Sequence, residues 1–204
     1  MTKTRLLLAT NNAGKIRELV HLLEGIPLAI TTPEDEGVVL DVEETGTTFE
    51  ENAKLKAVAF ASASGLRALS DDSGLEVDAL GGEPGIFSAR YAGLNATSEQ
   101  MVKYLLNKLN DVDWARRKAT FRSVIAIAEP GGGGVEIFEG KCDGIISLEP
   151  HGTKGFGYDP IFYIPSLGRH MAELDLDEKN HISHRGIAAR RVIEFFKKEA
   201  DRKE

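Results

Sequence analysis

The chain has 204 residues, 42% of them hydrophobic and 28% charged, which is typical of a globular protein with one sizeable core or two small lobes. It has 32 acidic and 25 basic residues, and the net charge of −7 repels a nucleic-acid backbone and disfavours a nucleic-acid binder. Cys142 is the only cysteine, so no intrachain disulfide can form. Apolar runs are too short for a signal peptide or a membrane span, and we expect a cytoplasmic protein with no membrane partner.

The first 31 residues predict a strand, a helix and a second strand. The apolar run 5–10 is typical of a buried strand, and 28–31 predicts the next one. Between them, a helix is expected over 15–24. Its apolar residues fall on one face: Ile16, Leu19, Val20 and Leu23.

A longer, alanine-rich helix is predicted next. Thr48 and Glu51 have the spacing of a capping box, in which each side chain bonds the other's backbone N–H. The helix should run to Ser64 and end at Gly65, since glycine readily adopts the left-handed conformation of a helix C-terminus.

Two adjacent carboxylates, Asp71 and Asp72, follow in the stretch Ser70–Gly74. Serine, aspartate and glycine together predict a tight bend, flanked by short strands over 68–70 and 75–77. Neighbouring carboxylates repel each other, so the pair suits a site where a divalent cation offsets the repulsion.

The rest of the chain predicts a strand-rich region and a final helix. The elements expected, in order, are a helix that Thr97 and Gln100 cap and that ends at Leu109, strands over 119–128, 135–142 and 144–148, a loop over 150–165, and a helix over 185–199. Glycines 131–134 should join two of these strands as a hairpin. Because helices alternate with strands early and a hairpin comes late, we expect an α/β fold with a mixed sheet.

Four polar clusters could carry chemistry. The turn from Thr10 to Lys15 leads into a helix, whose first N–H groups attract an anion. The other three are Glu43–Glu44 with Lys56, the Asp71–Ser73 acidic stretch, and the loop Gly155–Pro160 with Lys179, His181 and the helix start Ser183–Arg185. Each cluster alone also fits an ordinary turn, a core aromatic residue or a solvated helix start.

Taken in order, these clusters resemble the inosine/xanthosine triphosphate pyrophosphatase family. The resemblance runs nearly end to end and rests on six segments: Ala9–Lys15, Glu44–Ala53, Asp71–Leu75, Gly82–Tyr91, Phe156–Pro160 and Ile182–Arg185. It implies a single domain over 1–204 with an elongated mixed sheet split into two lobes, flanked by helices, and an active-site cleft between the lobes. It also implies a homodimer.

The same resemblance implies an enzyme and its site. The expected reaction is Mg²⁺-dependent hydrolysis of ITP, dITP or XTP to the nucleoside monophosphate and pyrophosphate. Glu44 and Asp72 would bind the metal, and Asp72 would also accept the proton of the attacking water. The substrate-binding residues implied are Thr10, Asn11, Asn12, Ala13, Gly14, Lys15, Lys56, Ser73, Phe156, Gly157, Tyr158, Asp159, Lys179, His184 and Arg185.

Two alternatives stay open at this level. A related pyrophosphatase of the Maf type would act on pyrimidine nucleotides, although the motifs around Phe156 and His184 argue against it. A non-catalytic nucleotide sensor is disfavoured because Asp71 and Asp72 place negative charge where a triphosphate would sit.

Overall fold

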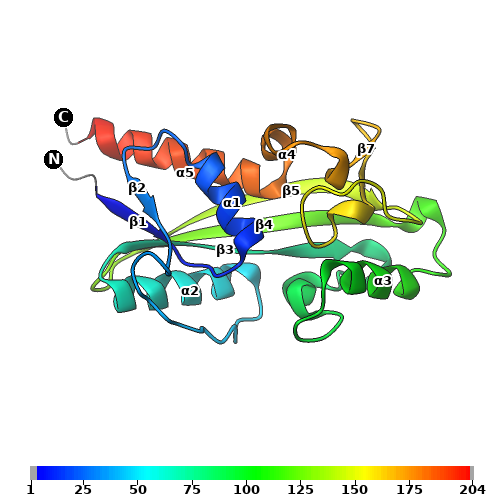
Figure 1. The fold of residues 1–204 in the computed structure, drawn as a ribbon, viewed down its shortest axis with the longest axis horizontal. Helices are drawn as coiled ribbons and strands as arrows, with labels where there is room; N and C mark the ends of the chain where they lie inside the picture. Colours follow the sequence, from blue (N-terminus) through cyan, green and yellow to red (C-terminus); the bar gives the residue numbers. More distant parts are fainter. Residues whose placement is uncertain (1–3, 203–204) are drawn as a thin grey trace. The chain divides into compact units, whose positions relative to one another are not determined.

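The computed structural model describes residues 4–202, which form a mixed seven-stranded sheet flanked by helices (Figure 1). The strands are β1 Arg5–Leu8, β2 Ala29–Thr31, β3 Arg67–Val77, β4 Lys118–Ala128, β5 Val135–Ile146, β6 Phe162–Ile164 and β7 Arg169–His170, and the helices are α1 Ala13–Leu22, α2 Phe49–Ser64, α3 Ser98–Lys108, α4 Leu176–Ile182 and α5 His184–Asp201. The strand order is β2-β1-β3-β4-β5-β6-β7. Since β1 is parallel to β2 and β3 while β6 is antiparallel to β5 and β7, the predicted α/β class with a mixed sheet is confirmed.

The chain divides into two compact units. Unit 1 holds the residues up to Asp72, Ser123–Gly140 and the residues from Arg185 onward, and unit 2 holds Ser73–Arg122 and Lys141–His184. The expectation of a single domain with a cleft between two lobes stays a prediction, and both ends of its range 1–204 lie outside the described residues. Within those residues, no helix is long and apolar enough to cross a membrane.

The core of unit 1 lies between its sheet and helices α1 and α5. Leu19 and Leu23 from the α1 region and Val192 and Phe196 from α5 pack with apolar side chains of β1, β3 and β4. Helix α2 covers the opposite face of the same strands (Figure 1). Leu6–Leu8 of β1 and Ala68–Asp72 of β3 are therefore buried on both faces, as expected for parallel pairing.

One prediction about the face of α1 is wrong. Val20 is 40% exposed, whereas Glu18 is 3% exposed and occupies a core-facing position. A buried carboxylate on this face requires a cationic partner, and that partner belongs to the candidate site.

The core of unit 2 forms around α3. Met101, Val102 and Leu105 are buried against a cluster that includes Phe121 of β4 and Phe162 of β6. Both predicted bonds of the capping box at Thr97 and Gln100 are present, so the start of this helix is confirmed.

The capping box predicted for α2 is only half confirmed. Thr48 accepts a hydrogen bond from the backbone N–H of Glu51 at 3.1 Å, as expected. The carboxylate of Glu51, however, accepts from the N–H and hydroxyl of Thr47, one residue earlier than the box requires. Gly65 ends the helix with φ of 68°, as predicted.

Three further local predictions are wrong. The acidic stretch is not a bend between two strands but the middle of the continuous strand β3. Residues 144–148 do not form a separate strand, because β5 runs on to Ile146. The region 150–165 is not all loop: it contains a 3₁₀ turn over Asp159–Ile161 and strand β6. In β3 and β6, hydrogen bonding to a neighbouring strand overrides the local turn propensity.

Candidate active site

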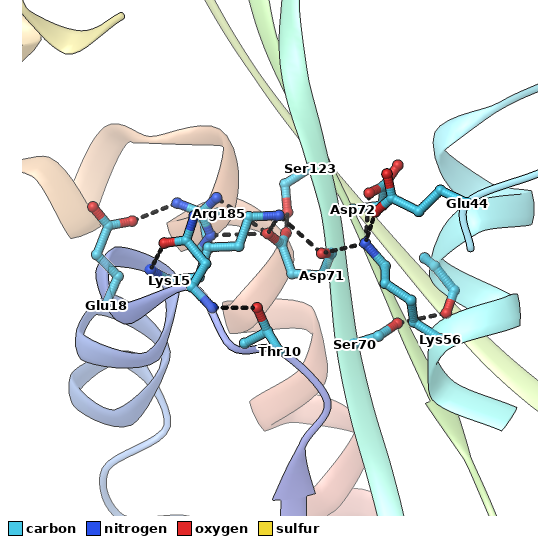
Figure 2. A network of polar contacts seen from close by, with 12 residues as sticks. Thr10, Lys15, Glu18, Glu44, Lys56, Ser70, Asp71, Asp72, Ser123 and Arg185 are labelled. Carbon is cyan, nitrogen blue, oxygen red and sulfur yellow. Dashed lines mark hydrogen bonds and ion pairs between the residues drawn. The ribbon is translucent and has the colours of Figure 1, made fainter. Parts of the chain in front are cut away.

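The acidic pair in the middle of β3 is split between the two faces of the sheet. Successive side chains of a strand point to opposite faces, so Asp71 and Asp72 point away from each other. Figure 2 shows Asp71 on the side of Lys15 and Arg185, and Asp72 on the side of Lys56 and Glu44. The repulsion expected between adjacent carboxylates is thus avoided, because each one has its own cations.

Asp71 is the centre of a buried charge network in unit 1. Its carboxylate is held by Lys15 from α1 at 2.9 Å and by Arg185 from α5, whose Nη2 lies 3.1 Å away. The hydroxyl of Ser123 on β4 donates to the other carboxylate oxygen at 2.5 Å. Since Asp71 is 1% exposed, the network joins two helices and two strands by charge-assisted bonds away from water.

Arg185 is itself fully buried, with 1% exposure. Its Nη1 donates to Glu18 on α1 at 2.5 Å, while Nε and Nη2 both donate to Asp71. Sequence reasoning missed Glu18 and Ser123. The available signal for Glu18 was its position one turn after Lys15 on a helix face that is otherwise apolar.

Asp72 belongs to a second charged cluster on the α2 side. The ammonium nitrogen of Lys56 lies 2.6 Å from a carboxylate oxygen of Asp72 and 2.8 Å from one of Glu44. It also lies 3.3 Å from the backbone oxygen of Asp71. The structure therefore brings together Glu44, Lys56 and Asp72, three of the predicted site residues.

The position of Glu44 depends on a close approach between its segment and the first turn of α2. The N–H of Gly46 donates to the side-chain oxygen of Asn52 at 2.8 Å. A Cβ at residue 46 would lie 2.6 Å from that same oxygen and 2.7 Å from Cβ of Glu51. Glycine at this position thus allows the segment to lie against the helix that carries Lys56.

The predicted anion-binding turn precedes α1. The hydroxyl of Thr10 accepts from the N–H of Asn12 at 3.2 Å, and the Asn12 side chain accepts from the N–H of Lys15 at 3.1 Å as the helix cap. Asn11 and Ala13 are exposed, and Gly14 is half-buried. The Lys15 ammonium, however, is turned inward, 3.0 Å from the backbone oxygen of Asp71.

The two aspartates have opposite pKa shifts. Burial raises the pKa of Asp71, but the charges of Arg185 and Lys15 outweigh it and leave that pKa well below its usual range. Burial also raises the pKa of Asp72, and there Lys56 and Lys15 offset only part of the effect. Asp71 therefore stays charged at neutral pH, whereas Asp72 is a better proton acceptor than an ordinary aspartate.

The pKa values of Lys15 and Lys56 are also shifted in opposite directions. Burial lowers the pKa of Lys15 more than the charge of Asp71 raises it. For Lys56, burial lowers the pKa, but the nearby carboxylates of Asp72 and Glu44 raise it by more. The ammonium between the two carboxylates thus stays charged.

In unit 2, a tight loop brings Phe156, Asp159 and Lys179 together. The carboxylate of Asp159 accepts from the N–H of Phe156 at 2.8 Å and forms a buried ion pair with Lys179. The Lys179 ammonium lies 4.9 Å from the centre of the Phe156 ring. Gly155 has φ of 74°, and a Cβ there would lie 2.0 Å from the carboxylate of Asp159, so this loop requires glycine.

The remaining predicted residues of unit 2 are held by its own elements. The Gly157 N–H donates to the hydroxyl of Ser98 at 3.0 Å, and the Tyr158 hydroxyl donates to the backbone oxygen of Ser88 at 3.0 Å. The His184 ring stacks on Phe121 at 4.8 Å with 13° between the planes. Ser73, the first residue of unit 2, is half-buried on β3.

The arrangement in unit 1 offers acidic oxygens and cations side by side. Among residues 4–202, no group of three or more histidine, cysteine, aspartate or glutamate side chains is placed to hold a metal ion by itself. Glu44 and Asp72 nevertheless lie close enough to share one cation, since both contact the ammonium of Lys56. Such a pair can bind a metal together with ligands that a substrate supplies.

Proteins with similar sequences have been named for a nucleotide activity. A protein of Geobacter sulfurreducens named dITP/XTP pyrophosphatase is 50% identical over 185 residues, which cover 91% of this chain and 92% of that protein. A protein of Shigella flexneri with the same name is 48% identical over 194 residues, covering 95% and 98% of the two chains.

Solved structures and a family model agree with this likeness. A HAM1 protein from Coxiella burnetii matches with a TM-score of 0.87 and 43% identity, over 96% of this chain and 99% of that one. The Ham1 protein of Staphylococcus aureus matches with a TM-score of 0.85 and 42% identity, over 96% and 100%. The model of the Ham1 family covers residues 6–195, and the chain therefore belongs to the Ham1 family.

Proposed function

We propose that this protein hydrolyses the nonstandard purine nucleoside triphosphates ITP, dITP and XTP to the nucleoside monophosphate and pyrophosphate. The observation that carries the proposal is the near-complete match, at 50% identity, to a protein named dITP/XTP pyrophosphatase. Membership of the Ham1 family over residues 6–195 supports it. The paired acidic and basic side chains of unit 1 supply the chemistry that such a reaction needs.

The metal in this proposal is Mg²⁺, held by Glu44 and Asp72. Mg²⁺ is usually bound by one or two carboxylates with waters and substrate phosphates, and two carboxylates that share one ammonium suit that role. When bound, Mg²⁺ would neutralise phosphate charge and polarise the phosphoryl oxygens. Asp72 is assigned as the proton acceptor for the attacking water, the role that the family resemblance implies for it.

The phosphates are assigned to the turn from Thr10 to Lys15 and to Lys56. Asn11, Asn12 and Ala13 of this turn are exposed at the N-terminus of α1, where backbone N–H groups favour an anion. Arg185 is assigned a different role from the substrate contact that the family resemblance implied. Its guanidinium is buried against Glu18 and Asp71, so it fixes Asp71 and, through it, Lys15.

The base is assigned to Phe156–Asp159 with Ser73, Lys179 and His184. A 6-oxo purine offers a hydrogen-bond acceptor where adenine offers an amino donor. Lysine and protonated histidine only donate, so they favour the 6-oxo group and leave an unmet donor against adenine. Phe156 supplies an apolar ring beside the Lys179 ammonium.

The proposal also places the enzyme in the cytoplasm as a homodimer. Cys142 is the only cysteine, and a chain that can form no intrachain disulfide fits a reducing compartment. The thiol is buried, and burial raises its pKa to about 11. Several large apolar side chains of unit 2 are exposed in the single chain, and a second copy could cover them.

The test is a substrate panel. Pyrophosphate release is measured with Mg²⁺ from ITP, XTP, GTP, ATP, dTTP and UTP. We expect kcat/KM for ITP and XTP to exceed that for ATP by about 100-fold or more, because the unmet donor is costly. Equal rates on all six nucleotides, or none on ITP and XTP, would contradict the proposal, and a preference for dTTP or UTP would favour the Maf-type alternative.

The same assay tests the role of Asp72. The substitution Asp72→Asn keeps the shape of the side chain but removes the base, and we expect kcat to fall by about 10²–10⁴ with the fold retained. The control is Asp78→Asn, an exposed aspartate that should leave the rate unchanged. An Asp72→Asn enzyme with near-normal turnover would remove Asp72 as the proton acceptor.

A further inference from the structure

The ammonium of Lys56 occupies a site lined by oxygen atoms. One oxygen each from Asp72, Glu44 and the backbone of Asp71 lies at 2.6, 2.8 and 3.3 Å. The site is partly closed to water, because the side chains of Lys56, Asp72 and Glu44 are 13%, 8% and 24% exposed. An oxygen-lined, partly buried position is what a cation requires.

The charges at this position balance only in part. Two carboxylates face one ammonium, so the cluster has a formal charge of −1 with Lys56 in place. Without that ammonium the carboxylates of Glu44 and Asp72 would face each other with no cation between them, which is unfavourable at low exposure.

We propose that Lys56 is an internal counter-ion that occupies the metal position until Mg²⁺ arrives, and that the metal and this ammonium exclude each other. The inference rests on the proposed function, in which Glu44 and Asp72 are the metal ligands. Lysine suits the role because its flexible four-carbon stem lets the charge move while the helix stays in place.

The exclusion follows from the geometry. Mg²⁺ binds oxygen at about 2.0–2.1 Å, so an ion shared by the two carboxylate oxygens that Lys56 contacts at 2.6 and 2.8 Å would lie where the ammonium lies. A divalent ion at that place would also repel the ammonium. Lys56 must therefore turn away when the metal binds, and in the proposed function the phosphates of the nucleotide are anions that would receive it.

This exchange couples the metal to the nucleotide. A free enzyme that must displace its own ammonium binds a divalent ion weakly. A nucleotide that accepts the ammonium removes that cost and so strengthens metal binding, and by linkage the metal strengthens nucleotide binding by the same factor.

The test measures divalent-ion binding to the protein without nucleotide. Mn²⁺ is the probe, since it accepts the same oxygen ligands and its free concentration is read by electron paramagnetic resonance. We expect Lys56→Met to bind Mn²⁺ at least about tenfold more tightly than the wild type, because a competing charge is gone. Lys56→Arg, which keeps the charge, should bind as weakly as the wild type.

A matched control lies two residues earlier on the same helix. Lys54 pairs with Glu50 at 2.5 Å on a half-exposed surface, so Lys54→Met removes a lysine charge from α2 without touching the carboxylate pair. Its Mn²⁺ affinity should match the wild type. Unfolding by urea reports whether each variant is folded, and Lys56→Gln replaces Lys56→Met if the latter is not.

Unchanged or weaker Mn²⁺ binding by the folded, uncharged variant overturns the inference. That failure differs from a failure of the proposed function. If the wild type releases pyrophosphate from ITP while the variant gains no Mn²⁺ affinity, only the counter-ion role is lost. If the wild type hydrolyses no purine triphosphate, the proposed function is lost whatever the Mn²⁺ result.

Discussion

At the scale of single residues, one step along β3 separates a structural charge, Asp71, from Asp72, the residue to which the proposed function assigns the chemistry. Asp71 is enclosed by Arg185, Lys15 and Ser123, which hold its pKa well below the usual range. Asp72 faces Lys56 and Glu44, and burial raises its pKa. The sequence alone could identify both as candidates, but only the alternation of a strand assigns each to its partners.

The buried charge of Asp71 predicts that the unfolding free energy of the protein depends on pH. In the folded protein the pKa of Asp71 is lowered, so its contribution is complete above the unfolded value near 4 and is lost as the pH falls toward the folded value. We expect Asp71→Asn to lose about 3 kcal/mol of unfolding free energy at pH 7, because Arg185 and Lys15 lose a shared buried partner.

The check is urea unfolding of both proteins between pH 7 and pH 3. The difference in unfolding free energy should stay constant down to about pH 5 and shrink below it, as the wild type loses the benefit of its charge. A difference that grows as the pH falls would contradict this account of Asp71.

Glu18 and Ser123 of the site were missed in the sequence. Glu18 was overlooked because a lone glutamate on a helix is ordinarily solvated, and Val20 was assigned to the core in its place. What decides between them is the guanidinium of Arg185, which comes from a helix 167 positions later in the chain. No local pattern reports such a distant partner.

At the scale of elements, helix ends were the best predicted features. Thr48, Thr97 and Gly65 act through bonds to residues only a few positions away, so their roles are visible in sequence. The bend predicted at Ser70–Gly74 was wrong for the opposite reason. Its turn propensity is overridden by pairing of β3 with β1 and β4, strands that are distant or later in the chain.

The loop that carries Phe156 gives a prediction at this scale. Gly155→Ala would place a methyl group 2.0 Å from the Asp159 carboxylate at a φ of 74°, so the loop must shift and the contact with Lys179 must loosen. We expect a rise of about tenfold or more in KM for ITP, with Mn²⁺ binding to the free protein unchanged.

The control for this prediction is Gly81→Ala. Gly81 has a similar φ of 64° and lies in unit 2, but a Cβ there meets no atom within 4 Å. We expect Gly81→Ala to lower the stability of the protein through left-handed backbone strain and to leave KM for ITP unchanged. Equal KM values for the two variants would mean that the loop does not take part in nucleotide binding.

At the scale of the whole molecule, the sequence predicted the class but not the order of strands. The mixed sheet follows from early alternation and a late hairpin. Strands β6 and β7 have three and two residues, too few for a periodic pattern, and they lie within or just after the stretch 150–165 that was expected to be loop. Their existence depends on pairing with β5, which is a property of the folded sheet.

The proposed homodimer is testable at this scale. In unit 2, Leu94 is 83% exposed and Tyr104 38%, and both line a surface cavity of about 410 Å³. We expect light scattering to give twice the mass of the chain, and Leu94→Asp to weaken the association at least about tenfold by placing a charge on this surface.

Val39→Asp is the matched control, because Val39 is 100% exposed but lies in unit 1. It should leave the association unchanged. A wild type that is monomeric at micromolar concentration would refute the dimer, whereas a dimer that tolerates Leu94→Asp would move the interface elsewhere.

The different surroundings of Asp71 and Asp72 on β3 have a consequence for which mutations the gene tolerates. If the proposed function holds, a substitution of Asp71 is selected against because it destabilises the fold, and a substitution of Asp72 because it lowers turnover. Second mutations that restore a variant of Asp71 should therefore lie in α1, β4 and α5. Those that restore a variant of Asp72 should lie in α2 and in the segment before it.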